Sequence, residues 1–376
     1  MQKKEVKAAI DWFMHSGVQN SADILDTEGN DLAGSFNAWY DLENNQFSYA
    51  YLEITGYALT TFLYLYKVTN DNILFDKAII IGDWLLKKQN SSGAFLTAYY
   101  HSQKNGPIKP EEFHSFDIGM IANGLANLYR YNKDEKYLLA ARKAADWLIS
   151  FQDTDGSIAA QVGKDDGLIK DHSKTWSTQA GPYHAKLAIG FLNIYDLTNE
   201  EKYKIAAEKL CNYALTKQKQ DGQFLTYGDL DGTNLHPHAY SAEGLYVAGM
   251  FLKNQEYLNA AKKGVEWALL NTKDGIVPRH KHGEVFNYNE RVDILAQISR
   301  LAILLGISDK KIDEILLSIK KYQYFGPNKS QVGGFLFGKM SNGIEAKHVN
   351  SWVSMFALQA LILDDEKKLE NLFLLV

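Results

Sequence analysis

Hydrophobic positions along the chain follow a helical period, and one pattern built on that period recurs. An amphipathic helix ends in an aromatic residue and a glutamine, and a few polar residues then lead to Gly-x-Phe or a similar apolar ending. Copies of this pattern contain Trp12, Trp84, Trp147, Tyr213, Trp267 and Gln323. Such self-similarity predicts a repeat architecture, in which each unit buries its apolar face against its neighbours.

A second, more apolar helix is expected between successive amphipathic helices. These inner helices are predicted at 50–67, 115–131, 181–197, 238–253, 289–305 and 349–363. Apolar residues on all sides mark a buried helix, and internal glycines such as Gly56 and Gly124 allow close packing. Six outer and six inner helices predict an all-α (α/α)6 barrel, a six-hairpin toroid forming a single domain over residues 1–376. The N-terminal outer helix would then close the ring against the last inner helix, 349–363.

The links between these predicted helices differ in length. Links from an inner to the next outer helix are short, whereas links from an outer to the next inner helix are long, as at 90–114 and 323–348. The long links therefore gather on one face, where the inner helices begin. Because binding residues concentrate on loops held by a rigid scaffold, we expect the functional site at this mouth.

Carboxylates are expected in the first turn of four inner helices, and we interpret them as catalytic candidates. They are Asp117, Glu243, Glu53 and Asp293. Hydrolysis of a glycosidic bond uses two carboxyl groups, for which Asp117 and Glu243 are preferred and the other two are held in reserve. The alternative is purely structural, because an acid in a first turn is stabilised by the helix dipole by about 0.3–1 kcal/mol.

Aromatic and polar residues near the same helix starts are candidate binding residues. The chain holds 22 Tyr, 18 Phe and 7 Trp, and such rings can cover the C–H face of a sugar. The predicted binding residues are Trp39, Tyr51, His114, Trp176, Gln179, Tyr183, His184, His238, Tyr240, Arg279, Tyr288, Arg291 and Trp352. The two arginines suit a ligand carboxylate or sulfate, or alternatively pair with neighbouring acids.

Most histidines also fall near the predicted mouth. They are His101, His114, His172, His184, His236, His238 and His348, with His280 and His282 in another such loop. The two His-x-His pairs lack a surrounding set of ligands, so no metal site and no cofactor are expected. Each histidine is more often a hydrogen-bonding scaffold residue than an acid or base.

Composition narrows the range of partners. The formal net charge is −5 and lysines are spread along the whole chain, which excludes the basic stripe of a nucleic-acid-binding protein. The single cysteine, Cys211, excludes an intrachain disulfide framework. No signal-like start and no apolar stretch of membrane-spanning length are present, so we expect a cytoplasmic location. The sequence leaves the oligomeric state open.

One segment carries a family resemblance. Phe113-His114-Ser115-Phe116-Asp117-Ile118-Gly119 resembles the His-Asp-x-Gly-Phe segment of unsaturated glucuronyl hydrolases, which implies that Asp117 is an essential acid. The second aspartate of that family has no counterpart in the stretch 179–184. The barrel class also includes glucuronyl C5-epimerases, whose resemblance implies tyrosines and acids around a uronate. The Gln…Gly-x-Phe turns are similar to the repeats of terpene cyclases and prenyltransferases, but the Asp-x-Asp-Asp acid motif of those enzymes is missing.

These observations predict a carbohydrate-active enzyme. The leading hypothesis is acid/base hydrolysis of an oligo- or polysaccharide that contains uronate. A uronosyl C5-epimerase or a polysaccharide lyase is the first alternative, with His or Tyr as the base and Arg stabilising the developing charge. A non-catalytic toroid that binds a glycan or a protein is the second, and a prenyl or terpenoid enzyme is the least favoured.

Overall fold

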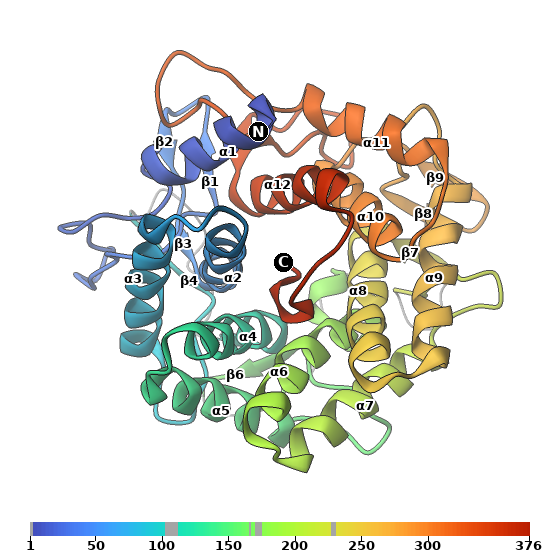
Figure 1. Ribbon diagram of the computed structural model, residues 1–376, viewed down its shortest axis with the longest axis horizontal. Coiled ribbons are helices and arrows are strands. Elements are labelled where there is room, and N and C mark those ends of the chain that lie inside the picture. Colours follow the sequence, from blue (N-terminus) through green and yellow to red (C-terminus); the bar gives the residue numbers. More distant parts are fainter. Residues whose placement is uncertain (1–2, 102–111, 165–166, 170–174, 227–230) are drawn as a thin grey trace.

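A computed structural model of the chain describes residues 3–101, 112–164, 167–169, 175–226 and 231–376. In this part of the chain twelve α-helices alternate between an outer and an inner ring, which confirms the predicted (α/α)6 barrel (Figure 1). The outer helices are α1 (Lys4–His15), α3 (Asn72–Lys88), α5 (Glu135–Ser150), α7 (Glu201–Thr216), α9 (Gln255–Leu270) and α11 (Lys310–Lys321). The inner helices are α2 (Leu52–Thr69), α4 (Ser115–Asn132), α6 (Ala188–Thr198), α8 (Leu235–Leu252), α10 (Val292–Leu304) and α12 (Ser351–Glu366).

The repeated glutamine ties each turn to the next outer helix. The side-chain amide of Gln218 donates to the carbonyl of Gly222 in its own turn at 3.1 Å and to the carbonyl of Ala260 on α9 at 2.8 Å. Gln89 and Gln152 bond in the same way to α5 and α7. Gln323 repeats the arrangement with Glu5 on α1, so this contact joins the turn after the last outer helix to the first outer helix.

The glycine of each turn is required by the same contact. Gly34, Gly93, Gly156, Gly222, Gly275 and Gly333 all have positive φ, and a Cβ on any of them would lie closer than 3.0 Å to a backbone carbonyl oxygen of the following outer helix. For Gly333 that carbonyl belongs to Ala8 of α1. An L side chain is disfavoured at such φ values, and here the neighbouring backbone also leaves no space for one.

Short strands organise the long links at the mouth. Strands β3 (Ala50–Tyr51), β5 (Glu112–His114), β7 (Gly232–Asn234) and β11 (His348–Asn350) lead directly into inner helices. Their partners are, in the same order, β4 (Ala98–Tyr99), β6 (Gln161–Gly163), β8 (His280–His282) and β1 (Trp39–Asp41). The sheet of β11 and β1 is extended by β10 (Phe335–Leu336) and β2 (Gln46–Phe47), and the sheet of β7 and β8 is extended by β9 (Val285–Asn287). The pairing of neighbouring links fixes the direction in which these four inner helices start.

The last residues of the chain enter the centre of the ring (Figure 1). A short 3-10 helix at Leu372–Leu374 is held by Asn123 and Asn127 of α4, whose side-chain amides donate to the Phe373 carbonyl at 2.9 and 2.8 Å. Gln359 of α12 donates to the Leu374 carbonyl at 2.9 Å. Among the described residues, no helix is both long and apolar enough to cross a bilayer.

The starts of two inner helices differ from the prediction in ways that affect the site. The helix predicted over 181–197 starts as a 3-10 helix at Pro182–Leu187 and becomes α6 only afterwards, preceded by another 3-10 turn at Trp176–Thr178. Helix α8 begins at Leu235 rather than at 238, so the expectation that Glu243 lies in a first turn is wrong. Pro237 fits the first turn of α8, because the backbone N–H groups there have no intrahelical acceptor.

Replacing a turn glycine should destabilise the protein through both backbone strain and steric conflict. We expect Gly222→Ala to lower the free energy of unfolding by at least about 2 kcal/mol more than Gly29→Ala. Gly29 is a matched control because it also has positive φ, but no atom lies within 4 Å of the position that an added methyl group would occupy. Urea denaturation followed by circular dichroism measures both, and equal losses would show that the contact with α9 is unimportant.

Candidate active site

A pocket of about 220 Å³ opens at the mouth, where several inner helices begin. Nine of the predicted site residues line it: Tyr51, Glu53, His114, Asp117, Trp176, Tyr183, Tyr240, Arg291 and Trp352. Ile54, Phe116, Ser177 and His236 complete the lining. The pocket therefore combines two carboxylates, one guanidinium group, two imidazoles and a wall of aromatic rings.

Glu53 and Asp117 come from neighbouring inner helices. Glu53 is in the first turn of α2 and Asp117 in the first turn of α4, directly after strands β3 and β5. Asp117 is buried, whereas Glu53 is partly exposed and hydrogen-bonded by Tyr51. Burial, together with the charges of Asp117 and Glu53, raises the pKa of Tyr51 well above its ordinary value. The charges of both carboxylates thus act on the Tyr51 hydroxyl, so the two groups lie at the same part of the pocket.

Aromatic rings form a continuous wall beside this pair. Phe116 packs against Tyr240 and Tyr183 with ring centroids 4.7 and 5.6 Å apart. Trp176 lies edge-on to Tyr183 at 5.1 Å, and His236 packs against Tyr240 at 4.4 Å. These rings give the pocket an aromatic wall against which the C–H groups of a sugar can pack.

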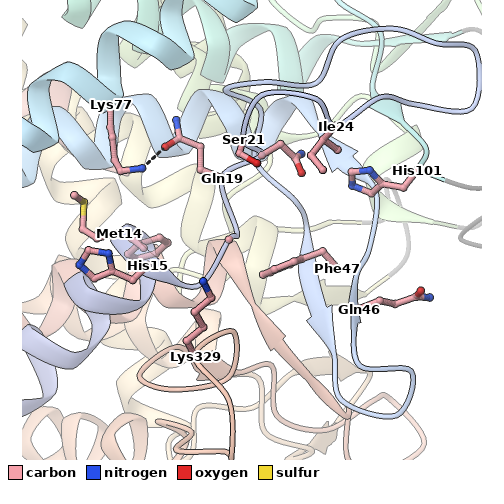
Figure 2. Close-up of a pocket in the computed structure, with 13 residues that line it drawn as sticks. Met14, His15, Gln19, Ser21, Ile24, Gln46, Phe47, Lys77, His101 and Lys329 are labelled. Atoms are coloured by element: carbon pink, nitrogen blue, oxygen red, sulfur yellow. Dashed lines mark hydrogen bonds between the residues drawn. The ribbon is translucent and has the colours of Figure 1, made fainter.

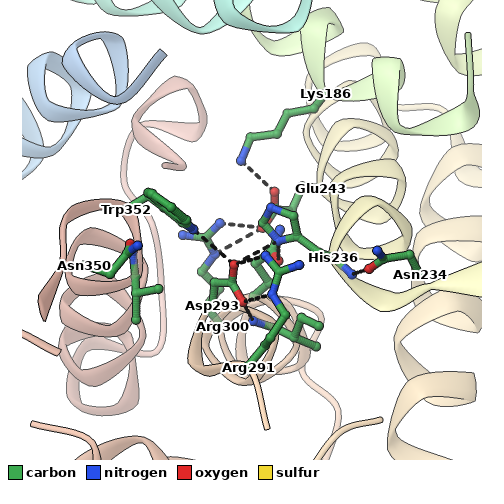
Figure 3. A network of polar contacts seen from close by, with 12 residues as sticks. Lys186, Asn234, His236, Glu243, Arg291, Asp293, Arg300, Asn350 and Trp352 are labelled. Atoms are coloured by element: carbon green, nitrogen blue, oxygen red, sulfur yellow. Dashed lines mark hydrogen bonds and ion pairs between the residues drawn. The ribbon is translucent and has the colours of Figure 1, made fainter. Parts of the chain in front are cut away.

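Asp293 lies behind the pocket wall and is fully buried, at 0% exposure (Figure 3). Its carboxylate accepts hydrogen bonds from Arg291, with Nε at 3.1 Å, and from Trp352 Nε1 at 3.1 Å. His236 Nδ1 lies 3.5 Å from the same carboxylate. Burial opposes the charge of Asp293, but Arg291 and His236 lower its pKa to about 2. Asp293 thus orients three residues of the pocket and balances the charge of Arg291.

Glu243 does not line the pocket and belongs to a buried ion-pair cluster. It is 0% exposed and forms ion pairs with Lys186, at 2.7 Å, and with Arg300 (Figure 3). Burial would raise the pKa of Glu243, but Arg300 and Lys186 hold it below its ordinary value. Burial lowers the pKa of Lys186 to about 8 despite Glu243. Because Glu243 does not line the pocket, we do not retain it in the proposed catalytic pair.

The remaining predicted binding residues lie outside the pocket. His238 and His184 are buried among backbone groups, with His238 Nδ1 accepting from the Phe224 N–H at 3.2 Å.

Arg279 donates to the Lys339 carbonyl at 2.6 Å, and the Tyr288 hydroxyl donates to the Asn271 carbonyl at 3.0 Å. Trp39 and Gln179 flank the pocket, Trp39 through its contact with Trp352 and Gln179 next to the Trp176 turn. His172 lies outside the described residues.

His236 lines the pocket, although its predicted position near the mouth did not make it a predicted site residue. Its Nδ1 is 2.7 Å from Gln297 Oε1, and burial lowers the pKa of its imidazole to about 4. The signal that could have found it is Pro237, which marks the start of α8 and so places His236 in the first turn. Among the described residues, no three His, Cys, Asp or Glu side chains are arranged to hold a metal ion.

Comparison with protein families gives one match within the ring. A family model described as glycosyl hydrolase family 76 matches residues 112–229, which is less than half of the chain. The matched segment contains Asp117, Trp176 and Tyr183 from the pocket. No curated protein sequence matches the chain significantly.

Solved structures match over almost the whole chain at low sequence identity. Cellobiose 2-epimerase from Bacillus thermoamylovorans B4167 has a TM-score of 0.75 at 12% identity, covering 95% of this chain and 97% of its own. The unsaturated glucuronyl hydrolase of Bacillus sp. GL1 has a TM-score of 0.68 at 15% identity, covering 97% of both chains. A D-mannose isomerase has a TM-score of 0.71 at 14% identity, covering 96% of both. This likeness confirms the fold and the predicted resemblance to toroid enzymes that act on carbohydrates.

The charge of Asp293 should stabilise the fold in a pH-dependent way. Its pKa is about 2 in the folded protein against an ordinary value of 3.8. The stabilisation, about 2 kcal/mol, is therefore present above pH ~4 and is lost as the pH falls towards 2. We expect Asp293→Asn to be less stable than the wild type at pH 6, with a gap that narrows by more than about 1 kcal/mol at pH 2.5.

Urea unfolding at the two pH values measures this gap. Asp76→Asn, on the exposed face of α3, is the control and should show a small difference that does not vary with pH. A gap for Asp293→Asn of the same size at pH 6 and pH 2.5 would contradict the prediction.

Proposed function

We propose that the protein hydrolyses a glycosidic bond of an oligo- or polysaccharide, with Asp117 and Glu53 as the carboxyl pair. The observation that carries this proposal is that both carboxylates line one pocket whose walls are aromatic. Glycoside hydrolysis uses one carboxyl group to protonate the leaving oxygen and a second to act as base or nucleophile. The partial match to glycosyl hydrolase family 76, which includes Asp117, supports the same chemistry.

The environments of the two carboxyl groups suggest how the roles divide. Asp117 is 3% exposed and lines the pocket beside Phe116, Tyr51 and Tyr183, and burial in general disfavours the charged form of a carboxyl group. Glu53 is nearer to solvent and accepts a hydrogen bond from Tyr51, which favours its charged form. Asp117 would therefore be the general acid, and Glu53 the base or nucleophile.

The charges of the pocket favour a neutral sugar over the uronate expected from the sequence. Arg279 and Arg291 were the residues expected to bind a uronate carboxylate, but Arg279 does not line the pocket, and Asp293 accepts from Nε and Nη2 of Arg291. The charge of this guanidinium group is therefore balanced within the protein. A bound uronate would in addition face the charged Glu53, and like charges repel. A uronate remains the alternative, supported by the fold shared with an unsaturated glucuronyl hydrolase.

Loss of either carboxyl group should abolish hydrolysis while leaving the fold intact. We expect Asp117→Asn and Glu53→Gln each to lower kcat by about 10²–10⁴-fold, because each removes a proton-transfer or nucleophilic step. Reducing-end release from a panel of neutral and uronate-containing oligosaccharides measures the rate. Glu284→Gln, on an exposed turn of a mouth loop, is the matched control and should leave the rate unchanged.

Thermal shift with the same panel separates the alternatives. Stabilisation of both wild type and Asp117→Asn by a sugar, with no product from either, would indicate a non-catalytic glycan-binding toroid. Faster turnover of uronate-containing than of neutral substrates would contradict the charge argument but not the hydrolysis.

His236 favours a second candidate, epimerisation or isomerisation of a sugar. Its Nδ1 lies 2.7 Å from the amide oxygen of Gln297 and 3.5 Å from the Asp293 carboxylate, and these two acceptors favour the tautomer with the proton on Nδ1 and a lone pair on Nε2. The low pKa of His236 keeps the imidazole neutral near pH 7, as a base must be. Such a base could remove the proton from the carbon next to the carbonyl of an open-chain sugar. Returning a proton to the opposite face of that carbon would complete an epimerisation, and returning it to the former carbonyl carbon would complete an isomerisation. Cellobiose 2-epimerase and D-mannose isomerase share the fold.

Deuterium exchange tests this second candidate directly. If it holds, incubation with cellobiose or mannose in D₂O should place deuterium on the carbon next to the carbonyl, seen by NMR. His236→Asn should then lower the exchange rate by at least about 100-fold, whereas His282→Asn, on an exposed strand end, should not. Reducing-end release without any deuterium incorporation would exclude the isomerase chemistry and leave hydrolysis.

A further inference from the structure

Lys186 places a second positive charge beside Glu243 in the ring interior. It belongs to the 3-10 helix Pro182–Leu187, and its side chain is 1% exposed. Its ammonium donates to Oε2 of Glu243 at 2.7 Å, whereas Arg300 on α10 donates from Nε and Nη2 to Oε1 (Figure 3). This cluster therefore contains two cations and one carboxylate.

The charge of Lys186 exceeds what the cluster itself requires. Arg300 alone balances the charge of Glu243, and a neutral donor would be enough to satisfy the second carboxylate oxygen. Burying a further charge is costly, and burial lowers the pKa of Lys186 to about 8. The amine is nevertheless mostly protonated at neutral pH. An excess buried charge next to a pocket is a signal of function.

The Lys186 ammonium lies among aromatic rings that connect it to the pocket. Its Nζ is 4.5 Å from the ring centroid of Tyr240, which lines the pocket, and 5.0 and 5.2 Å from the centroids of Tyr57 and Phe356. Tyr57 follows Glu53 by four residues on α2, so the two side chains lie on the same face of that helix. Glu53 is therefore one helical turn from a ring that contacts Lys186.

Electrostatic interactions also connect Lys186 to Glu53. Burial lowers the pKa of Lys186, and the negative charges of Glu243 and, more weakly, of Glu53 oppose that effect. Burial raises the pKa of Tyr57 well above its ordinary value, and the charge of Glu53 acts in the same direction. Because the attraction between two charges is mutual, the ammonium favours the charged form of Glu53 in turn.

We propose that Lys186 is a positioning residue whose ammonium keeps Glu53 ionised as the base or nucleophile, without contacting the substrate. This inference rests on the hydrolysis proposed above, in which Asp117 is the protonated acid and adds no charge. The charged groups that face Lys186 are Glu243 on α8, Arg300 on α10 and Glu53 on α2. The Lys, Arg, Asp and Glu side chains of the pocket and its two buried clusters then balance as three cations and three carboxylates: Lys186, Arg291 and Arg300 with Glu53, Glu243 and Asp293.

A double-mutant cycle measures the coupling between Lys186 and Glu53 without an activity assay. Urea unfolding at pH 6 is followed for the wild type, Lys186→Met, Glu53→Gln and the double variant. We expect Lys186→Met to change the folding equilibrium constant at least about threefold less favourably when Glu53 is present than in the Glu53→Gln background, because only a charged Glu53 attracts the ammonium. Lys186→Gln keeps a donor for Glu243 and takes the place of Lys186→Met if that variant does not fold.

Lys77→Met is the matched control. Lys77 on α3 is also a partly buried lysine whose pKa is lowered by burial. It donates to Gln19 at 2.9 Å in a separate cavity of about 690 Å³, bounded by α1, β2 and α3 (Figure 2). This cavity shares no lining residue with the candidate active site. The effect of Lys77→Met on stability should therefore be additive with that of Glu53→Gln.

The pH dependence of kcat/KM tests the consequence for catalysis, with the oligosaccharide of the panel that the wild type cleaves. Its acidic limb reports the ionisation of the essential base, so Lys186→Met should move this limb upward by at least about 0.5 pH unit and Lys77→Met should not move it. Coupling below about threefold, failure of both Lys186 variants to fold, or an unmoved acidic limb in a folded variant would overturn the proposal. If the wild type cleaves no sugar, the proposed hydrolysis fails, and the cycle still decides whether Lys186 acts on Glu53.

Discussion

The contact between a turn glycine and the backbone of the next outer helix is the constraint on which the rest of the structure depends. Each turn lacks a side chain where the carbonyl of its neighbour approaches, and the contact from Gly333 to Ala8 completes the circle. Because consecutive outer helices are spaced by these contacts, the inner helices are held with their N-termini on one face. The pocket at the mouth exists because Glu53 and Asp117 begin adjacent inner helices in this ring.

Two buried ion-pair groups lie next to the residues that line this pocket. Arg291 with Asp293, and Lys186 and Arg300 with Glu243, place five charges in or beside the ring interior. Isolated charges would be strongly destabilising there, so each group persists only because its partners and hydrogen bonds compensate desolvation. Lys186 also lies 4.5 Å from the ring centroid of Tyr240, which lines the pocket. The buried charges thereby fix the aromatic wall on which a sugar would lie.

The sequence predicted the ring well because repetition is a property of spacing, and the spacing of Trp84, Gln89 and Gly93 follows directly from the turn contact. It predicted nine pocket residues because helix starts could be located. It failed for Glu243, where helix α8 starts at Leu235, ahead of the predicted start, and a carboxylate assigned to a first turn lies deeper in the ring. Single-sequence patterns also gave no sign of the strands in the long links, since these strands pair segments that are distant in the sequence.

The pairing of Arg291 with Asp293 also bears on the proposed role of Asp117. A general acid must hold its proton near neutral pH, and an uncompensated guanidinium group in the same pocket would favour the charged form of Asp117. Asp293 accepts from Nε and Nη2 of Arg291 and remains ionised, so the positive charge that Asp117 experiences is reduced. Asp293, which the sequence suggested as a reserve catalytic acid, would on this argument serve catalysis by balancing the charge of Arg291 and orienting His236 and Trp352, without contacting the substrate.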